Sequence, residues 1–350
     1  MSRSGSAAEN IPVAESELSA LFDDFARSRK TLLAVSGGPD STALLVLAAR
    51  WRVLRGGGPE LVAATIDHGL RAASKGEAKA VEKLAGKLGI PHHTLVWKGK
   101  KPITGVQEAA REARFALFSS LAKEVGADLL MTAHTRDDQA ETVLHRMGRG
   151  SGLGGLAGIR RVHKRDGVFF GRPFLDLPKA RLVATLMKLG IPYASDPTNQ
   201  DPKYLRARLR KLAPALAKEG IDAANLALMA KRLGRANAAL NRLAEEAAFA
   251  LRMDREAGRA FEARGFFLMP DELSIRMLRE AIDAHGIEGP AELAKVEALF
   301  EALVAAYRAG EEIKRTLAGA AVMLSEAALV VAGAPPRKAV PRPVKRSRKA

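Results

Sequence analysis

The stretch LAVSGGPDS, residues 33–41, decides the fold of this 350-residue chain. A short apolar run ends there, and two glycines, a proline and three side chains with oxygen atoms surround its end. A glycine-rich turn between a strand and a helix lets backbone N–H groups approach a phosphate, and the helix N-terminus adds a favourable dipole. Taken alone, the turn could equally be a plain strand-to-helix connection that Asp40 or Ser41 caps.

The rest of the first half alternates short apolar runs with helical patterns. We expect strands at 31–37, 61–69, 92–97, 128–134 and 168–174, and helices at about 40–52, 74–88, 106–121 and 136–147. This alternation predicts an α/β fold, a Rossmann-like parallel sheet with helices on both faces. Ligands of such folds bind beyond the carboxyl ends of the strands, where the segments SGGPDS, DHG and AHTRDDQ all fall.

The chain divides into four segments by its composition. We expect an N-terminal extension at 1–28, a catalytic domain at 29–212, a smaller, mostly helical domain at 213–333 and a basic, disordered tail at 334–350. Alanine- and leucine-rich helical patterns dominate the third segment, which also has short β-like pieces at 266–269 and 320–333.

The positive charge is confined to two places. The net charge is +17, and residues 146–210 contribute +10 of it, with 14 Lys or Arg and 4 Asp or Glu. The tail from 335 onward contributes the other +7. Such confinement favours contact with a polyanion, although a solvated, solubilising surface is the alternative.

Missing residue types exclude several classes of protein. The chain has no cysteine, so it has no disulfide, thiolate metal site or cysteine nucleophile. No apolar run approaches the roughly 18 residues that a membrane span needs, and the first 28 residues lack the apolar core of a secretory signal. We therefore expect a cytoplasmic protein without membrane contact.

The glycine-rich stretch resembles the pyrophosphate loop, SGG-x-DS, of the ATP pyrophosphatase superfamily. The motifs that follow are DHGLR (67–71), EAAREARF (108–115), TAHTRDDQAETVLHRMGRGSGLGGLAGI (132–159), GRPFL (171–175) and DPTNQDPKYLRARLR (196–210). In this order and spacing they resemble the tRNA(Ile)-lysidine synthase family. The resemblance is dense over about 31–210 and more diffuse over 215–333.

The resemblance implies a specific ATP-dependent reaction on tRNA. ATP would adenylate the C2 oxygen of the first anticodon base, a cytidine, of a tRNA(Ile) with a CAU anticodon. An amine of free L-lysine would then displace AMP, so that the tRNA reads AUA and is charged with isoleucine. No catalytic cysteine is needed, whereas the thiolating enzymes of the superfamily require one to carry sulfur. The implied cofactors are ATP and Mg²⁺, and a homodimer is an open possibility.

The resemblance also assigns roles to individual residues. ATP would be bound by Ser36, Gly37, Gly38, Pro39, Asp40, Ser41, Asp67 and His68. The catalytic residues would be Asp40, Asp138 and Glu141, and lysine would be bound by Asp138, Glu141 and Arg111. Mg²⁺ would be held by Asp40 and Asp137. The tRNA would be bound by Arg149, Arg160, Arg161, Arg206, Arg208 and Arg210.

Several of these assignments have a structural alternative. Asp138 and Glu141 lie three residues apart, so they share one face of a helix, but acidic residues are also favoured near a helix N-terminus. Arg71, Arg111 and Arg114 suit phosphates or a carboxylate, or they are surface arginines. The segment 146–161 combines glycines and arginines, which suits a flexible basic segment that closes over a nucleotide or an anticodon loop, or else a solvated linker. The row of Arg206, Arg208 and Arg210 would splay in a helix and align in a strand.

Two positions depart from the family pattern. Thr135 stands where the family commonly has a second histidine, and Ala207 stands where it usually has asparagine. Two other functions also deserve a test. A small-molecule amidating enzyme of the NAD synthetase type would not need the clustered charge, and a non-catalytic RNA-binding protein would not need Asp40, Asp138 and Glu141.

Overall fold

The computed structural model describes residues 10–67, 74–97, 106–194, 203, 205–254 and 258–335. The chain divides into two compact units, residues 1–234 and 235–350. Within the described parts of both units, every helix is too short or too polar to cross a membrane.

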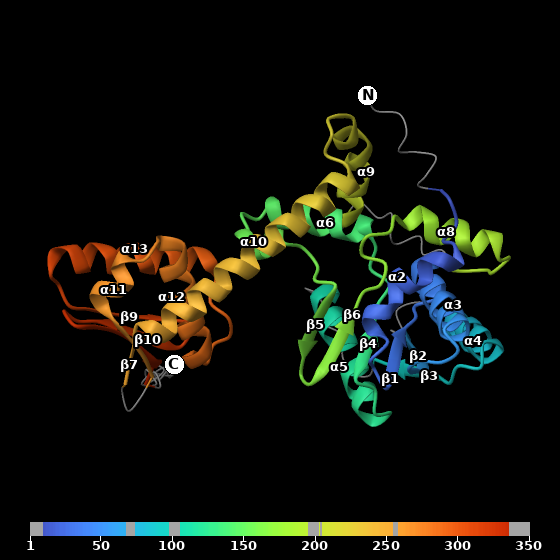
Figure 1. Cartoon of the computed structure of the whole chain (residues 1–350), viewed down its shortest axis with the longest axis horizontal. Helices are drawn as coiled ribbons and strands as arrows, with labels where there is room; N and C mark the ends of the chain where they lie inside the picture. Colours follow the sequence, from blue (N-terminus) through green and yellow to red (C-terminus); the bar gives the residue numbers. More distant parts are fainter. Residues whose placement is uncertain are drawn as a thin grey trace, which may run out of the picture. The chain divides into compact units, whose positions relative to one another are not determined.

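A six-stranded sheet forms the centre of the first unit (Figure 1). Its strands, in spatial order, are β3 (His92–Val96), β2 (Glu60–Asp67), β1 (Lys30–Ala34), β4 (Leu129–Met131), β6 (Val168–Gly171) and β5 (Val162–Arg165). The first five are parallel, and β5 pairs antiparallel with β6. The predicted Rossmann-like sheet is confirmed. Its strand order reverses between β1 and β4, and ligands of open parallel sheets bind at such a point.

Helices bury both faces of this sheet. Leu33 and Ala63 belong to the core on one face, with α3 (Pro39–Leu54), α4 (Ser74–Lys87) and α8 (Lys179–Lys188). Leu32 and Val62 belong to the core on the other face, with α5 (Val106–Glu124). Neighbouring strand residues therefore point to opposite, equally buried faces, which explains the continuous apolar runs of the sequence.

Part of the expected N-terminal extension packs into the first unit. Three short helices follow one another here, η1 (Glu15–Glu17), α2 (Leu18–Phe22) and η2 (Asp23–Phe25), and the last two contribute buried side chains to the core beside α3. Phe22 stacks on Trp51 with 5.4 Å between ring centroids. The indole N–H of Trp51 donates a hydrogen bond of 2.8 Å to Asp23. These residues therefore close one side of the α/β core.

The edge strand β5 is an element that the sequence pattern did not reveal. It forms a hairpin with β6, closed by Asp166 and Gly167, whose φ angles are 51° and 88°. Asp-Gly is a preferred pair for a two-residue turn that needs positive φ. The strand itself is polar and mostly exposed, so no apolar run marks it.

Four helices complete the first unit near the carboxyl ends of the strands. They are α6 (Arg136–Met147), α7 (Leu153–Leu156), α9 (Leu205–Lys218) and the beginning of α10 (Ala223–Ala250). A small apolar cluster of Ala140, Val143, Leu226 and Ala230 joins α6 to α10. The segment 205–210 is helical, which settles the alternative between a splayed and an aligned arginine row.

The glycine-rich segment after α6 is anchored rather than free. The side chain of Gln139 accepts a hydrogen bond of 2.6 Å from the N–H of Ile159 and donates one of 3.2 Å to its carbonyl. Arg146 donates to the carbonyls of Gly155 and Gly158 at 2.7 and 2.8 Å. Two side chains of α6 therefore hold the backbone at residues 155–159, and closure of the segment over a nucleotide or an anticodon loop stays a prediction.

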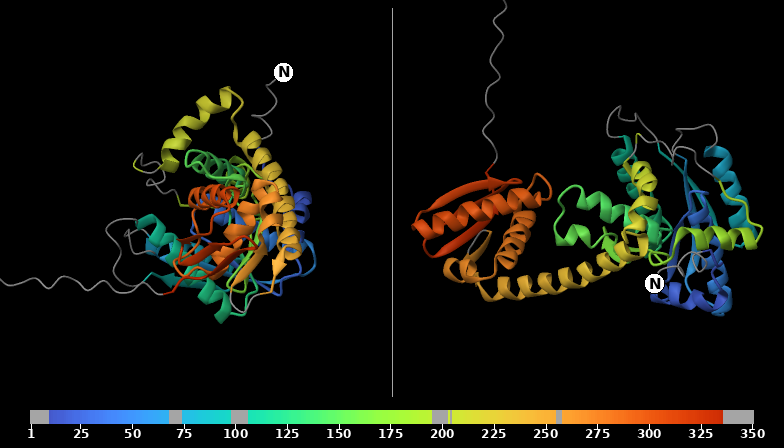
Figure 2. Two further views of the ribbon diagram at one scale, coloured as in Figure 1. Left: turned by 90° about the vertical axis from the view of Figure 1, so that its left-hand side faces the viewer. Right: turned by 90° about the horizontal axis from the view of Figure 1, so that it is seen from above.

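The second unit joins helices to a five-stranded antiparallel sheet. Its order is β7 (Arg252–Met253), β8 (Arg259–Glu262), β11 (Ala328–Gly333), β10 (Ala320–Leu324) and β9 (Ile313–Leu317). Helices α12 (Asp271–His285) and α13 (Leu293–Ala309) pack along the sheet (Figure 2). The β-like pieces at 320–333 are strands.

The β-like piece expected at 266–269 is wrong, because those residues lie mainly in the short helix α11 (Ala263–Leu268). The side chain of Glu262 starts this helix by accepting hydrogen bonds from the N–H groups of Arg264 and Gly265. Phe266 is fully buried in the core of the second unit. A capping side chain and one buried aromatic ring thus override the local β-like pattern.

Candidate active site

The stretch 36–41 forms a tight loop between β1 and α3. Gly37 has a φ of 86°, a conformation that strains any residue with a Cβ atom. Gly38 is the N-cap of α3 and Pro39 follows as its first residue, an arrangement that suits the fixed φ of proline. The loop therefore leads directly to a helix N-terminus, which favours bound anions.

The hydroxyl groups of the loop hold its shape. Ser41 Oγ accepts from the N–H of Ser36 at 3.0 Å and donates to the carbonyl of Gly38 at 3.1 Å. Ser36 Oγ lies 3.0 Å from Ser41 Oγ. Ser36 and Ser41 thus fix the backbone, and the predicted contact of either hydroxyl with phosphate stays a prediction.

The carboxyl ends of the neighbouring strands β2, β1 and β4 bring the predicted motifs to one edge of the sheet. Asp67 is buried at the carboxyl end of β2, which pairs with β1. The N–H of Ala194 donates to the carbonyl of Gly37 at 2.8 Å, so a later segment also reaches the loop. His68 and Arg71 lie outside the described residues.

Thr135 has a clear structural role at the start of α6. Asp138 accepts hydrogen bonds from the N–H and the hydroxyl of Thr135 at 2.8 and 2.9 Å, a reciprocal cap of the helix. Thr135 is buried. The departure from the family pattern therefore supplies an N-cap, and one oxygen of Asp138 is committed to it.

The acidic residues meet in one cavity of about 150 Å³ in the first unit. Its lining residues are Asp40, Thr135, Asp137, Asp138, Glu141, Lys179 and Arg210. The structure thus brings together four of the five carboxylates that the sequence analysis selected, and Asp67 is not among the lining residues. Arg111, predicted to bind lysine, is not among the described residues that line this cavity.

Asp40 links the glycine loop to this cavity. Lys179 Nζ lies 2.9 Å from Asp40 Oδ2, whereas the buried Oδ1 accepts no hydrogen bond from the described residues. Burial raises the pKa of Asp40, Lys179 opposes this shift, and Asp138 and Asp137 add to it. One oxygen of Asp40 is therefore held in place and the other is available to a ligand.

Lys179 is a site residue that the sequence analysis missed. It is the first residue of α8, and its N–H donates to Asp137 at 2.8 Å. A cation at the first position of a helix opposes the helix dipole. That unfavourable placement, four residues after the end of the quoted motif GRPFL, is the signal that could have revealed it.

Glu141 is paired with Arg210. The guanidinium binds both carboxylate oxygens, with Nη2 at 3.1 Å from Oε2. Glu141 is buried, while the side chain of Arg210 is 42% exposed. Arg210, predicted to contact tRNA, thus reaches into the acidic cavity from α9.

A group of arginines lies beside the cavity, and we call Arg111, Arg114, Arg172 and Arg206 the arginine recess. Burial and the nearby Arg111 and Arg206 lower the pKa of Arg114, although its side chain is accessible to solvent. Burial and Arg111 lower the pKa of Arg172 to about 10. No ion pair joins any of the four to a described carboxylate.

His134 lies between the cavity and the recess. Burial lowers its pKa to about 4, Asp138 opposes the shift, and Arg172, Arg206 and Arg114 reinforce it. Its Nδ1 is 2.8 Å from the hydroxyl of Thr132. His134 is therefore neutral at pH 7 and separates the acidic from the basic side chains.

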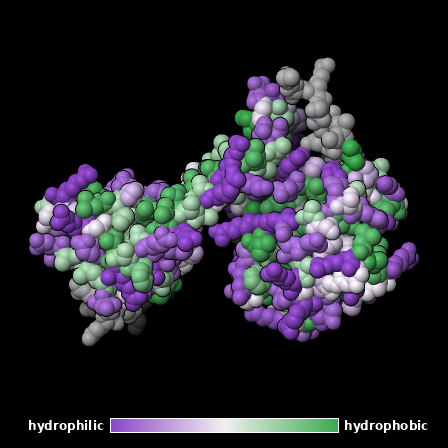
Figure 3. Space-filling view, in the orientation of Figure 1, coloured by the Kyte–Doolittle hydropathy of each residue, from purple (hydrophilic) through white to green (hydrophobic). Residues whose placement is uncertain are grey.

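The other predicted tRNA contacts fall into two groups. Arg149, Arg160 and Arg208 are exposed, and hydrophilic side chains cover most of the face of the first unit in Figure 3. Arg161 instead binds Asp24 at 3.0 Å and donates to the carbonyls of Leu21 and Pro173. Its guanidinium anchors the N-terminal helices, so the geometry does not support an RNA contact.

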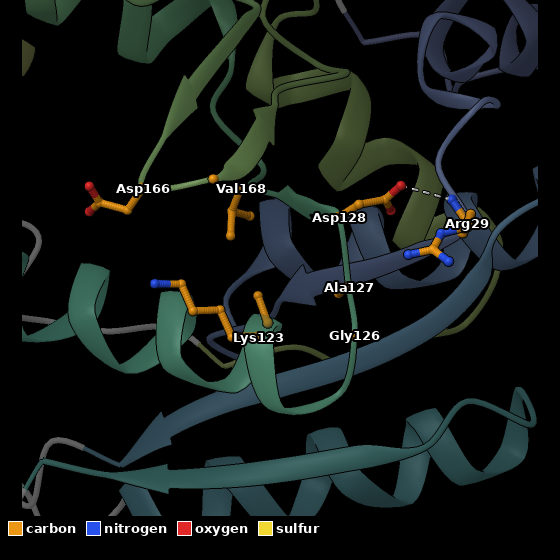
Figure 4. A pocket seen from close by; sticks show the side chains of 9 residues that line it. Arg29, Lys123, Gly126, Ala127, Asp128, Asp166 and Val168 are labelled. Carbon is orange, nitrogen blue, oxygen red and sulfur yellow. Dashed lines mark hydrogen bonds between the residues drawn. The ribbon is translucent and has the colours of Figure 1, made fainter.

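A second cavity, of about 270 Å³, lies at the opposite edge of the sheet. Its lining includes Arg29, Lys123, Asp128 and Asp166 (Figure 4). Asp128 accepts from Ser28 Oγ at 2.6 Å and from the N–H of Arg29 at 3.2 Å, which ties the start of β1 to β4. This cavity lies at the amino ends of the strands, away from every predicted motif, and we assign it no catalytic role.

Comparison with known proteins shows the family to which the chain belongs. Residues 11–216 match the PP-loop domain family ATP_bind_3. The chain is 49% identical to a tRNA(Ile)-lysidine synthase of Bradyrhizobium sp. strain BTAi1, over 95% of this chain and 98% of that relative. It is 50% identical to a tRNA(Ile)-lysidine synthase of Rhodopseudomonas palustris, over 95% and 99% of the two chains.

Among solved structures, the chain resembles a U34-tRNA thiolase from Methanococcus maripaludis that carries a [4Fe-4S] cluster. The TM-score is 0.54 at 18% identity, and the match covers 63% of this chain and 78% of the thiolase. This likeness supports the fold alone.

Proposed function

Because the chain belongs to the tRNA(Ile)-lysidine synthase family, we propose that it attaches L-lysine to C2 of the cytidine at the first anticodon position of tRNA(Ile) with a CAU anticodon. The enzyme is an ATP-dependent ligase that forms a carbon–nitrogen bond. The C2 oxygen attacks the α phosphate of ATP and releases pyrophosphate. A neutral amine of lysine then bonds to C2, loses its proton, and displaces the oxygen together with AMP.

The glycine loop is the proposed site of the ATP phosphates. Gly37 and Gly38 keep the approach free of side chains, and the N-terminus of α3 contributes its dipole. Asp40 stands at the first turn of that helix, beside the acidic cavity. The loop would thus hold the α phosphate beside the cavity, so that the adenylated C2 of the cytidine lies close to the lysine amine that attacks it.

The donor set at Asp40 fits Mg²⁺ bound together with phosphates. Its buried Oδ1 has no protein partner among the described residues, and Asp137 lies nearby in the same cavity. No described cluster of three or more acidic or histidine side chains forms a complete metal site. Mg²⁺ commonly uses one or two carboxylates plus substrate phosphates. Bound there, the ion would supply charge neutralisation for the departing pyrophosphate.

The composition of the acidic cavity is the observation that carries the lysine assignment. Four carboxylates, Asp40, Asp137, Asp138 and Glu141, face only two cations, Lys179 and Arg210. The excess negative charge suits an ammonium group of lysine. Asp138 and Glu141 are the proposed direct partners because the family resemblance assigns them to lysine, and both line this cavity, where Arg210 occupies Glu141.

The arginine recess is the proposed contact for the tRNA backbone. Arg114 and Arg206 carry positive charge that no described acidic side chain pairs, and phosphates supply the missing anions. Exposed Arg149, Arg160 and Arg208 would extend this contact. Arg111 serves either this backbone or the lysine carboxylate.

Transfer of radiolabelled lysine tests the proposal against both rival functions. Purified protein receives ATP, Mg²⁺ and a tRNA(Ile) transcript with a CAU anticodon. We expect label in the tRNA, and none when uridine replaces the first anticodon cytidine. ATP cleavage without label in tRNA would favour a small-molecule amidating enzyme, and tRNA binding without ATP cleavage would favour a non-catalytic protein.

Two proposals concern the setting of the reaction. We place the reaction in the cytoplasm, where tRNA is modified. We also keep the hypothesis that the protein is a homodimer, which size-exclusion chromatography with light scattering tests. A single peak at the mass of one 37.4 kDa chain would contradict the dimer.

A further inference from the structure

The acidic cavity already contains a side chain that resembles its proposed substrate. Arg210 enters from α9 and binds both oxygens of Glu141. Glu141 is buried, with its side chain only 10% exposed. A buried carboxylate of the cavity is therefore occupied by a side chain of the protein itself.

This pairing opposes the binding of lysine. An ammonium group can bind Glu141 fully only when the bidentate guanidinium withdraws, because the cavity of about 150 Å³ is lined by both partners. A buried carboxylate that loses its partner is strongly unfavourable. Arg210 therefore leaves at low cost only if an incoming cation replaces it and if the guanidinium gains another anion.

The position of Arg210 on α9 indicates where that second anion is found. Arg206 lies four residues earlier on the same helix, so the two side chains share one face. Arg206 acts electrostatically on Arg114 and His134 in the arginine recess. Arg210 acts on the other side, where Glu141, Asp138 and Asp40 hold its charge. One face of α9 thus extends from the proposed RNA contact to the proposed lysine site.

We propose that Arg210 is an internal occupant of the lysine site that withdraws toward an RNA phosphate when tRNA binds, so that lysine is admitted only to the tRNA complex. This inference rests on the proposed function. It assigns to Arg210 a gating role instead of a permanent contact with tRNA. It also orders the substrates, because the amine arrives after the RNA that it modifies.

Equilibrium dialysis of radiolabelled lysine, without ATP, tests this order. For the wild-type chain we expect tRNA with a CAU anticodon to tighten lysine binding by about tenfold or more, since an occupied site reduces apparent affinity by the fraction that is open. In Arg210→Met, which retains an unbranched stem without the charge, lysine should bind tightly without tRNA. Added tRNA should then change the Kd by less than about twofold.

Lys211→Met is the matched control. Lys211 is the next residue on α9, is exposed, and has no ion pair or hydrogen bond with the described residues. The variant removes the same charge from the same helix outside the cavity. Its lysine binding should retain the wild-type dependence on tRNA.

Three results would overturn the gate. In the first, tRNA does not change the affinity of the wild type for lysine. In the second, Arg210→Met binds lysine more weakly than the wild type when tRNA is left out. In the third, Lys211→Met behaves like Arg210→Met. If Arg210→Met fails to fold, as judged by circular dichroism, Arg210→Lys replaces it. In Arg210→Lys, one ammonium group replaces the bidentate guanidinium on Glu141 and should be displaced more easily by lysine. The KM for lysine should therefore be below the wild-type value, and a higher KM would contradict the gate.

The same materials separate this inference from the proposed function. If the wild type transfers lysine to tRNA and Arg210→Met keeps the wild-type dependence on tRNA, only the gate fails. If the wild type neither binds lysine in any state nor transfers it, the proposed function fails as well.

Discussion

The acidic cavity and the arginine recess are neighbours in one unit, yet they treat charge in opposite ways. In the cavity, Asp40 is paired with Lys179, and Glu141 with Arg210. In the recess, Arg114 and Arg206 have no described acidic partner. The protein thus pairs two of the four cavity carboxylates with cationic side chains and leaves an excess of negative charge, whereas the recess keeps an excess of positive charge.

The pKa shifts express the same contrast. Burial opposes the charge of Arg210, but its hydrogen bonds and attraction to Glu141 outweigh burial and raise its pKa. Burial and neighbouring arginines lower the pKa of Arg114 and Arg172. A protein that tolerates such repulsion without its ligand gives up stability for binding. The two regions therefore predict opposite effects of charge removal.

The largest expected effect is in the cavity. Asp40→Asn should lower the kcat of lysine transfer by about 10²–10³-fold, because it removes a carboxylate proposed to hold Mg²⁺ against the reacting phosphates. The melting temperature should change little, since burial already disfavours the ionised form of Asp40. Single-turnover transfer and thermal melting measure the two quantities. A variant with normal kcat would remove Asp40 from the catalytic residues.

His134, which lies between the two regions, should make the stability of the fold depend on pH. The pKa of His134 is about 4 in the folded chain, below its ordinary 6.5, so the unfolded chain binds the proton first as the pH falls. The stabilisation that comes from keeping His134 neutral is intact above about pH 6.5 and is lost as the pH falls toward 4. The free energy of unfolding should therefore be lower by about 2 kcal/mol at pH 5. Urea unfolding at pH 7 and pH 5 measures it.

His134→Asn is the control for that pH dependence. In this variant the free energy of unfolding should differ less between pH 7 and pH 5, because the contribution of His134 is gone. The contribution of His163 should remain, since burial and neighbouring arginines lower the pKa of His163 to about 4 as well. An unchanged pH dependence in the variant would show that His134 does not separate the two regions electrostatically.

In the recess, removal of charge should weaken function and spare stability. Arg114→Met should weaken tRNA binding by about tenfold and reduce the salt dependence, expressed as a log–log slope, by about one. The melting temperature should stay equal or rise, because repulsion from Arg111 and Arg206 is relieved. Filter binding between low and moderate salt gives the slope. An unchanged slope would contradict a phosphate contact.

The smallest expected effect concerns the helix that supports the cavity. Thr135→Val removes the cap of α6 and should cost about 1 kcal/mol of unfolding free energy. Thr142→Val on the same helix is the matched control, because its buried hydroxyl has no partner among the described residues. That change should be neutral or stabilising. If both variants lost the same unfolding free energy, the hydroxyl of Thr135 would not stabilise α6 as an N-cap.

Local patterns in the sequence determined most of the catalytic fold. The apolar runs before Ser36 and His68 and the helical period after Val106 predicted the sheet and its helices. The hairpin strand β5 escaped because it is polar, and α11 escaped because a single capping side chain, Glu262, decides it. Both depend on contacts that no periodicity records.

The site follows the same division. The motifs placed Asp40, Asp137, Asp138 and Glu141 at one edge of the sheet, because carboxyl ends of parallel strands meet there. Pairing across the chain was decided only by tertiary structure. Lys179 reaches Asp40 over 139 residues and Arg210 reaches Glu141 over 69. Spacing along a sequence reports which residues share a helix face or a strand end, whereas the partner of a buried charge depends on which distant element folds against it.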